Sequence, residues 1–278
     1  MGWSFTEDPE AFIAAVRPML LADPVSNTVA LSVLDTVRAG HRWSPEEPLT
    51  FAWHADPAGA VLMTPPYGLL LAQLPAGTEH DLVAGLHERG LAVPDAGGTV
   101  EAVERFSSCW LAGTELTTTP VFRQRLYRLA TLRPPEPMPA GAARRATEAD
   151  LDLVMAWLHA FRAESEPLGA PPTREMAGRR VGLGLVRLWQ DGHGAPVSLA
   201  GRNPVLGGAS RIGPVYTPPE RRRHGYAAAV AAAVSQDALD DGAEQVLLFT
   251  DLANPTANGV YRRLGYVGVQ DRLVLRYC

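Results

Sequence analysis

The sequence predicts an α/β (α+β) protein in which a mixed, twisted sheet is flanked by helices. In the second half of the chain, apolar strand-like runs alternate with helical segments, and such strand–helix–strand units give a partly parallel sheet with helices on its faces. The first half repeats a weaker version of this order, without a residue-level repeat. Between the halves, the segment 132–143 holds four closely spaced prolines, which cannot continue a helix or a central strand. We therefore expect a tandem of two related domains, 1–131 and 144–278, joined by a proline-rich linker over 132–143.

The first half opens with a helical stretch, in which Asp8 is the expected N-cap and Pro9 the first helical residue. Pro18 and Pro24 are expected to divide this stretch, because proline interrupts helical hydrogen bonding. The other runs are assigned from their apolar patterns and turn residues. The expected elements are helical segments within 8–40, a strand pair over 49–56 and 59–66, a strand over 68–74, a helix over 78–90, a short strand over 91–97, a helix over 99–113 and a closing strand over 122–132.

The second half begins with a helix whose expected N-cap is Thr147, with Asp150 completing a variant of the capping box. Gly242 is expected just past the end of an alanine-rich helix. Asn254 is the expected N-cap of a short helix that has Pro255 at its first position. The expected elements are a helix over 145–164, a strand–turn–strand over 181–203, a strand over 210–219, a helix over 223–243, a buried strand over 244–252, a short helix over 254–266 and a final strand over 269–277.

Composition excludes several classes of protein. The apolar fraction of 46% and the charged fraction of 20% are typical of globular chains. The net charge of −5 argues against nucleic acid or an anionic membrane as a partner. No apolar run is long enough for a transmembrane helix, and the N-terminus lacks the pattern of a signal peptide.

Two residue types narrow the chemistry further. The chain of 278 residues contains no lysine, which excludes Schiff-base lysine chemistry and a P-loop lysine. Its two cysteines, Cys109 and Cys278, are too few and too far apart in sequence for a disulfide framework or a zinc site. We expect free thiols in a reducing cytoplasm and no metal.

An arginine-rich turn, "PERRRHGYA" (219–227), lies between a strand and a helix. The first turn of a helix has unpaired N–H groups and the positive end of the helix dipole, so a purely structural turn would favour Asp or Glu. Arg221, Arg222 and Arg223 instead oppose the dipole, and their guanidinium groups suit phosphate oxygens. Gly225 lets a phosphate approach the backbone. The alternative is a solvated basic surface, but the conflict with the dipole favours a phosphate cradle. No G-x-G-x-x-G follows a strand, so a dinucleotide-binding fold is not expected.

The run Arg222-Arg223-His224-Gly225-Tyr226-Ala227 resembles the R/Q-x-x-G-x-G/A pyrophosphate motif of the GCN5-related N-acetyltransferase (GNAT) superfamily. The strand before it, "GPVYTPPE", is similar to that family's fourth strand, and "NPTANGVYRRLGY" (254–266) resembles its N-x-x-(N)-x-x-Y-x-x-x-G-F/Y segment. The resemblance covers residues 144–278. Many members have glycine where this chain has Arg223, a departure that affects side-chain contacts and not the backbone cradle. The first half has only "LPAG" where a cradle should precede a helix, so we expect a degenerate copy without a coenzyme site.

The resemblance implies a GNAT fold and transfer of an acyl group from acetyl-coenzyme A, usually to an amine. By analogy, the pantetheine arm pairs with main-chain groups of Val215 and Thr217 on a strand that Pro214 interrupts. The N–H of Val215 then faces the thioester oxygen as an oxyanion donor. Asn254 contacts the coenzyme in the family, although a simple N-cap explains it equally well.

Tyr261 stands where the family has its general acid, which donates a proton to the leaving thiolate; the alternative is a core aromatic. The attacking amine must also lose a proton, and Glu164, Glu166, Asp251 or ordered water are the candidates to accept it. The residues assigned to catalysis are Tyr261, Val215, Asp251 and Glu164; those assigned to coenzyme binding are Val215, Tyr216, Thr217, Arg222, Arg223, His224, Gly225, Tyr226, Ala227, Ala228, Asn254, Asn258 and Tyr261.

The expected function is therefore transfer of an acetyl group from acetyl-coenzyme A to a small-molecule amine by direct attack. A non-catalytic coenzyme-binding or regulatory module is one alternative, against which the presence of Tyr261 argues. A transferase that uses aminoacyl-tRNA is another, but tRNA binding needs a broad positive surface that a chain of net charge −5 does not suggest. The sequence leaves the acceptor and the oligomeric state open.

Overall fold

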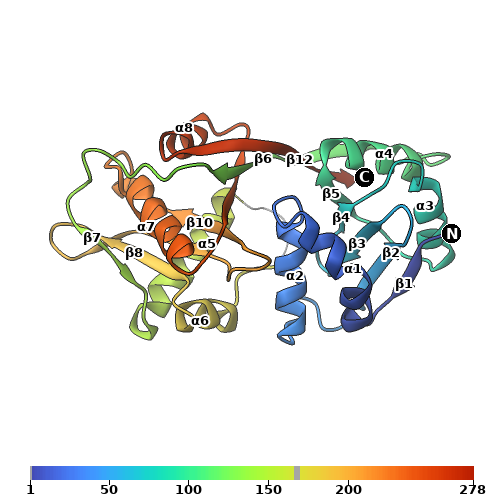
Figure 1. Cartoon of the computed structure of the whole chain (residues 1–278), viewed down its shortest axis with the longest axis horizontal. Helices are drawn as coiled ribbons and strands as arrows, with labels where there is room; N and C mark the ends of the chain where they lie inside the picture. The colour runs from blue at the N-terminus through green and yellow to red at the C-terminus, as the bar shows by residue number, and fades with distance from the viewer. Residues whose placement is uncertain (1, 166–169) are drawn as a thin grey trace. The chain divides into compact units, whose positions relative to one another are not determined.

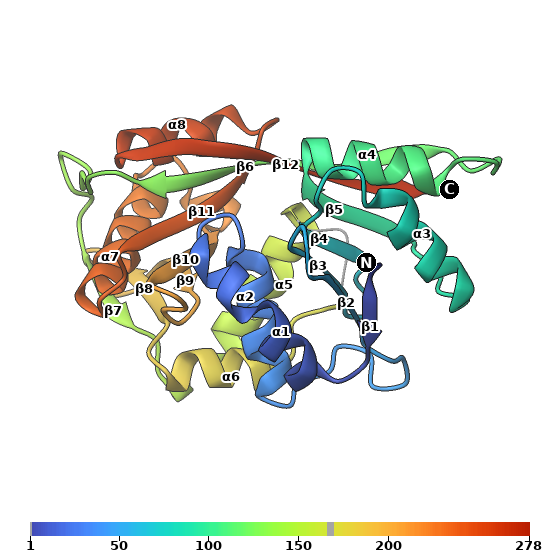
Figure 2. The ribbon, with the colours of Figure 1, turned by 45° about the vertical axis from the view of Figure 1, so that its right-hand side comes forward.

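The chain forms two compact units in the computed structural model, which describes residues 2–165 and 170–278. Unit 1 comprises Met1–Arg125 and Gln270–Cys278, and unit 2 comprises Leu126–Val269. In Figure 1 and Figure 2, unit 1 contains the blue to green elements and the red C-terminal end, and unit 2 contains the green-yellow to red elements between residues 126 and 269. Each unit is a mixed sheet with helices, which confirms the predicted fold class.

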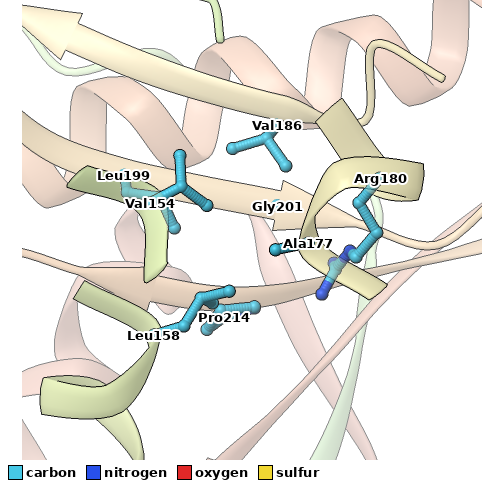
Figure 3. A pocket seen from close by; sticks show the side chains of 8 residues that line it. All are labelled: Val154, Leu158, Ala177, Arg180, Val186, Leu199, Gly201 and Pro214. Carbon is cyan, nitrogen blue, oxygen red and sulfur yellow. The ribbon is translucent and has the colours of Figure 1, made fainter. Parts of the chain in front are cut away.

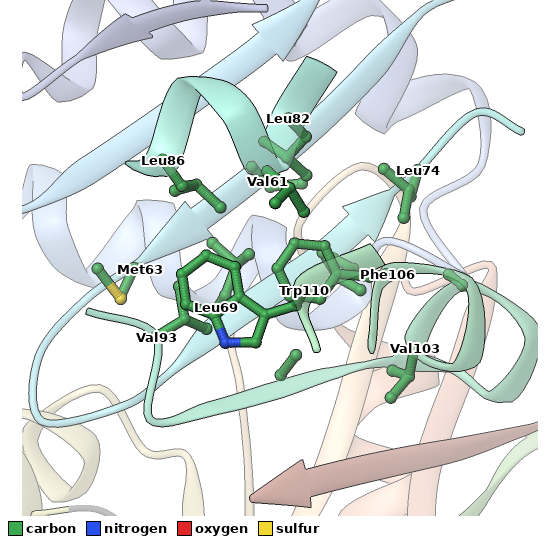
Figure 4. Packing of buried hydrophobic residues seen from close by; sticks show 14 of the residues in the cluster. Val61, Met63, Leu69, Leu74, Leu82, Leu86, Val93, Val103, Phe106 and Trp110 are labelled. Atoms are coloured by element: carbon green, nitrogen blue, oxygen red, sulfur yellow. The ribbon is translucent and has the colours of Figure 1, made fainter. Parts of the chain in front are cut away.

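Unit 1 has the strand order β1-β2-β3-β4-β5-β12, in which β4 and β5 pair in parallel and the other neighbours pair antiparallel. Helices α3 and α4 cover one face and helices α1 and α2 the other. Figure 4 shows the first of these cores, where Phe106 and Trp110 of α4 meet Leu82 and Leu86 of α3. The elements are β1 (Ser4–Thr6), α1 (Pro9–Ala22), α2 (Thr28–Arg38), β2 (Thr50–His54), β3 (Gly59–Met63), β4 (Leu69–Gln73), α3 (Glu79–Glu88), β5 (Asp95–Thr99), α4 (Val100–Trp110) and the end of β12 (Tyr266–Tyr277).

Unit 2 has the strand order β6-β11-β10-β9-β8-β7, with β10 and β11 parallel and the pairs from β7 to β10 antiparallel. Helices α5 and α6 cover one face, and α7 and α8 pack with the other. The elements are the end of β6 (Thr118–Leu129), whose start belongs to unit 1, then β7 (Ala142–Arg145), α5 (Leu151–Ser165), α6 (Arg174–Gly182), β8 (Val186–Gln190), β9 (Pro196–Arg202), β10 (Ala209–Tyr216), α7 (Tyr226–Asp240), β11 (Gln245–Asp251), α8 (Pro255–Arg263) and the start of β12.

The element order of the chain is repeated. The order from β1 to β6 is one strand, two helices, three strands, a helix, a strand, a helix and a strand. The same order recurs from β7 to β12, apart from two short 3₁₀ turns. The last strand of each repeat ends in the other unit: β6 ends in unit 2, where it lies beside β11, and β12 ends in unit 1, where Arg272–Arg276 pair with β5. The predicted domains 1–131 and 144–278 follow the repeats, whereas the compact units exchange these final strands; the domain boundaries stay a prediction.

The local capping predictions are confirmed. Asp8 Oδ1 accepts from the N–H of Glu10 at the start of α1, at 2.8 Å. Thr147 and Asp150 form the predicted capping box, which precedes α5 through one 3₁₀ turn. Each cap joins groups that are only two or three residues apart in the chain, so it can be predicted from local sequence.

Some predicted elements need correction. Pro18 does not divide the first helix, because α1 continues from Pro9 to Ala22 and buries Phe12, Val16 and Leu20 on one face. This packing outweighs the one hydrogen bond that proline removes. Three elements were not predicted, since each is short or weakly apolar: β1, β7 and α6. Strand β7 begins inside the segment that was expected to be only a linker.

Among the residues that the structure describes, no helix is long and apolar enough to cross a membrane.

Candidate functional site

The site in unit 2 begins where strand β10 separates from β11. The two strands pair in parallel from Ala209 to Ile212, and the described residues show no pairing between them beyond that point. The register between β10 and β9 then shifts between Ile212 and Val215, and pairing with β9 resumes at Val215 and Tyr216. The end of β10 therefore has one paired edge, toward β9, and one open edge, toward β11. An open edge offers backbone N–H and C=O groups to an extended ligand.

The chain then turns into helix α7 through Gly225, which is the N-cap and has a φ of 82°. The first turn of α7 contains no acidic residue and receives no side-chain cap. The first hydrogen bond within the helix runs from the N–H of Ala229 to the carbonyl of Gly225, at 3.1 Å. The N–H groups before Ala229 therefore have no partner within the helix, and with the helix dipole they form an anion-binding position.

Arg223 also lies in the left-handed region, with a φ of 67°. Such a conformation costs a residue with a Cβ roughly 1–2 kcal/mol, which explains physically why glycine would suit this position. Strain of this kind is concentrated at functional sites. The side chains of Arg223 and His224 are exposed, and the His224 ring stacks near Tyr226 with 5.6 Å between centroids.

The other two arginines of the turn contact acidic side chains. Arg222 Nη2 donates to Glu164 Oε2 of α5 at 2.6 Å, and its Nε donates to the carbonyl of Thr217 at 2.9 Å. The Glu164 carboxylate also accepts from the Tyr216 hydroxyl at 3.3 Å. Burial and then this carboxylate raise the pKa of Tyr216. Arg221 Nη1 lies 3.9 Å from Asp191 Oδ2. The candidate base Glu164 and the candidate phosphate ligand Arg222 are thus partners in an ion pair.

The opposite side of the opening is formed by the end of β11 and the start of α8. Asn254 caps α8 by accepting from the N–H of Ala257 at 3.0 Å, and its side chain is exposed. Asp251 is exposed and accepts from the N–H of Ala253 at 2.8 Å, so its carboxylate shapes the turn between β11 and α8. Glu166 lies outside the described residues.

Asn258 is buried and connects α8 to two strands. Its Oδ1 accepts from the hydroxyls of Thr250 at 2.6 Å and Tyr127 at 2.9 Å. Its Nδ2 donates to the carbonyls of Asp251 and Asn254, both at 2.7 Å. An asparagine side chain has two donor and two acceptor sites, so all four are used inside the protein. A direct contact between Asn258 and a coenzyme stays a prediction, while its structural role is evident.

Tyr261 lies on α8 and packs against the core between the sheet and α7. Its ring meets Tyr266 edge-on, with 5.9 Å between centroids. Burial raises the pKa of Tyr261 to about 12. Its hydroxyl therefore stays protonated at neutral pH, as a proton donor must.

Two groups beside the open strand were not predicted from the sequence. Ser198 of β9 is fully buried, and its hydroxyl donates to the carbonyl of Tyr216 at 2.9 Å and lies 2.8 Å from the Thr217 hydroxyl. Arg180 of α6 donates to the carbonyl of Gly213. Both contacts join residues that are distant in sequence, and no local pattern signals them.

A small, mostly apolar pocket lies behind the β10 irregularity, on the α5 and α6 side of the sheet (Figure 3). Helices α5 and α6 and strands β8, β9 and β10 all contribute to its walls. Its lining residues are Val154, Leu158, Ala177, Arg180, Val186, Leu199, Gly201 and Pro214.

The corresponding helix N-terminus in unit 1 is already occupied by an acid. Glu79 of α3 is buried, and its carboxylate accepts from the N–H of Gly77 at 2.7 Å and from Arg105 Nε at 2.5 Å. Burial alone raises the pKa of Glu79, but hydrogen bonds from its own N–H, Arg105 and Gly77 outweigh this and leave it below the ordinary value. The position that an anionic ligand would take at α3 therefore holds a side chain of the protein.

Comparisons with known proteins concern the fold of the chain and one family model. Residues 194–274 match the family model described as FR47-like protein. An acetyltransferase of the GNAT family from Colwellia psychrerythraea aligns over 100% of this chain and 99% of its own, with a TM-score of 0.61 and 12% identity. A GCN5-related N-acetyltransferase from Sphaerobacter thermophilus aligns over 99% of this chain and 95% of its own, with a TM-score of 0.60 and 18% identity. One from Kribbella flavida aligns over 90% of this chain and 95% of its own, with a TM-score of 0.56 and 22% identity. No curated protein matches the sequence. The chain therefore has the fold of these acetyltransferase structures, and residues 194–274, which contain the arginine-rich turn, match the FR47-like family model.

Proposed function

We propose that unit 2 binds acetyl-coenzyme A and transfers the acetyl group to the amine of a small molecule by direct attack. One observation carries the proposal: β10 leaves β11 after Ile212, and the chain then enters α7 through the glycine-capped, acid-free turn at Gly225. An open strand edge followed by an anion-binding helix N-terminus suits a ligand that has an amide-containing arm and a pyrophosphate.

The helix N-terminus supplies the phosphate cradle in this proposal. The backbone N–H groups from Gly225 to Ala228 receive the pyrophosphate oxygens, and the absence of an acid in the first turn of α7 leaves the position open. Arg223 and His224 are exposed beside it and add positive or donor groups. Arg222 contributes only when it exchanges Glu164 for phosphate. Their side chains are 45% and 42% exposed, so this pair is screened by water and its exchange costs little.

The open edge of β10 receives the pantetheine arm. Pro214 has no N–H, so Val215 is the first residue after Gly213 that carries a backbone N–H. We assign its N–H to the thioester oxygen, where negative charge develops during attack. Thr217 is buried and its hydroxyl lies against Ser198, which holds this end of the strand.

The reaction forms a C–N bond between the amine and the thioester carbon and breaks the C–S bond. The electron pair of that bond leaves with sulfur, and the Tyr261 hydroxyl donates the proton that neutralises the thiolate. Only the unprotonated amine is a nucleophile, so a proton must also leave the acceptor. Glu164 and Asp251 already accept hydrogen bonds from Arg222, Tyr216 and Ala253. We therefore favour ordered water as the first acceptor of that proton.

Titration of the full chain with acetyl-coenzyme A in a calorimeter, followed by a thiol-release assay with a panel of small amines, tests this function. Binding together with amine-dependent release of coenzyme A supports it. Binding without release for any amine in the panel supports the non-catalytic coenzyme-binding module instead. Absence of binding contradicts the proposal, and a test with aminoacyl-tRNA then follows.

A further inference from the structure

The strand irregularity in β10 is held by a side chain from helix α6. Arg180 Nη2 donates to the carbonyl of Gly213 at 2.5 Å and to the carbonyl of Arg202 at 3.1 Å. These carbonyls belong to β10 and β9, at the point where the register between the two strands shifts. One nitrogen thus joins both strands on the α5 and α6 side of the sheet.

Two glycines give this contact its room. A Cβ on Gly201 would lie 2.8 Å from Arg180 Nη2 and 3.3 Å from the Gly213 carbonyl oxygen, so a larger residue would displace the guanidinium. Gly213 has a φ of 152°, which residues with a side chain rarely adopt. Arg180, Gly201 and Gly213 therefore form this contact together.

The carbonyl that Arg180 holds directly precedes the proposed oxyanion donor. Gly213 contributes the carbonyl, Pro214 contributes no N–H, and Val215 contributes the next N–H along the strand. The Gly213–Pro214 peptide unit is planar and the ring of Pro214 fixes its φ, so only the ψ of Pro214 lies between the held carbonyl and the N–H of Val215.

We infer that Arg180 is a positioning residue, which aims the N–H of Val215 at the thioester oxygen by holding the carbonyl of Gly213. This inference rests on the proposed function for its ligand. It extends that function by placing one determinant of thioester recognition on α6, away from the phosphate cradle. Arg180 acts through the backbone and does not itself touch the reacting atoms.

The inference separates recognition of the thioester from recognition of the rest of the coenzyme. Coenzyme A and acetyl-coenzyme A carry the same phosphates and the same pantetheine arm, so they differ only at the acetyl group. One hydrogen bond to the thioester oxygen contributes about 0.5–1.5 kcal/mol, or a ratio of about 2- to 12-fold in affinity. The ratio of the two dissociation constants therefore reports on the Val215 donor.

The experiment compares these two dissociation constants by calorimetry for the full chain and four variants. Arg180→Met keeps the aliphatic stem but removes the donor, and should reduce the ratio to about 1 while the affinity for coenzyme A changes less than about 2-fold. Arg180→Lys should restore part of the ratio. Gly201→Ala should give the Arg180→Met result, because its Cβ displaces the guanidinium. Arg174→Met, an exposed arginine on the same helix, should leave both affinities unchanged.

A measurement without ligand keeps the inference testable whatever binds. In the free protein, the backbone amide NMR resonance of Val215 should shift in Arg180→Met and return toward its wild-type position in Arg180→Lys, while the Val246 amide of β11 stays in place. An unchanged Val215 resonance overturns the inference, and so does an unchanged affinity ratio in folded Arg180→Met. If wild-type protein binds neither coenzyme A nor acetyl-coenzyme A, the proposed function fails, and the amide resonances alone decide whether Arg180 orders Val215.

Discussion

Arg222 of the turn before α7 donates a hydrogen bond to Glu164 of α5, with 2.6 Å between Nη2 and Oε2. The pair connects the proposed coenzyme side of unit 2 with the helix that lines the pocket in Figure 3. Arg222 must leave this partner before it can contact a phosphate, so Glu164 competes with the coenzyme.

Glu164→Gln should therefore strengthen coenzyme A binding by about 2- to 5-fold, which corresponds to the free energy of a partly exposed ion pair. Glu220→Gln is the matched control, since it removes one negative charge from the same turn and leaves the Arg222–Glu164 pair in place. Calorimetric titration of both variants at one salt concentration measures the difference. Weaker binding to Glu164→Gln, or an equal gain in Glu220→Gln, contradicts the competition.

Tyr261→Phe should separate binding from chemistry. The ring stays packed against Tyr266, and the cradle is untouched, so the affinity for acetyl-coenzyme A should be retained. The acyl-transfer rate should fall by about 10²–10⁴-fold, in kcat and kcat/KM alike, because proton donation occurs only in the transition state. Rates measured with an amine found in the thiol-release assay give this comparison. If the variant keeps the full kcat, Tyr261 is a packing residue and not the proton donor.

The pH dependence has a definite sign. Burial raises the pKa of Tyr261 to about 12, so the hydroxyl is protonated throughout the range from about pH 6 to 10. The rate of the wild-type protein should therefore show no alkaline fall that is absent from Tyr261→Phe within this range. An alkaline limb in the wild type that disappears in Tyr261→Phe would mean that the tyrosine ionises there and that its environment differs from the one described.

Glu79→Gln should destabilise unit 1 by about 2–3 kcal/mol, because it weakens a buried network and removes the buried negative charge that pairs with Arg105. Glu101 also pairs with Arg105, but its side chain is 83% exposed. Glu101→Gln should therefore lower the free energy of unfolding by less than about 0.5 kcal/mol. Urea unfolding at neutral pH measures both. The folded pKa of Glu79 lies below its usual value, so its contribution is present above about pH 4.5 and declines as the pH falls. Equal midpoints for the two variants would refute the network.

Asn258→Ala should cost about 3 kcal/mol of stability, because it leaves the partners of four buried hydrogen bonds unsatisfied. Asn254→Ala removes only an N-cap and should cost about 1 kcal/mol. Thermal and urea unfolding compare the two. Similar losses would show that the buried hydrogen bonds of Asn258 contribute no more than a surface cap.

The helix starts on both sides of the opening could be predicted because their signals are local. Gly225 and the pair Asn254-Pro255 identify α7 and α8 within a few residues. The contacts Arg222–Glu164 and Arg180–Gly213 could not be predicted in this way, since they join segments that are separated by dozens of residues and have no pattern in common.

The exchange of final strands could not be predicted from the sequence either. Strands β6 and β12 have the same local pattern whichever sheet they join, so their sequences predict strands without predicting their neighbours. Helix α6 was missed because it buries only Ala177 and Val181, which is too weak an apolar pattern to indicate a helix. Because α6 was not predicted, Arg180 was not identified as a functional residue.

The central claim is that the turn at Gly225 is the coenzyme site of this chain and that unit 1, with Glu79 at the start of α3, provides none. Calorimetric titration with acetyl-coenzyme A of the wild type, Gly225→Glu and Gly242→Glu tests it most directly. Gly242 lies just past the other end of α7 with a φ of 85°, so both variants place a glutamate in a left-handed position beside the same helix. We predict one coenzyme bound per chain in the wild type and in Gly242→Glu, and none in folded Gly225→Glu, whose carboxylate would occupy the phosphate position. Two coenzymes per chain, or unchanged affinity in folded Gly225→Glu, would contradict the account.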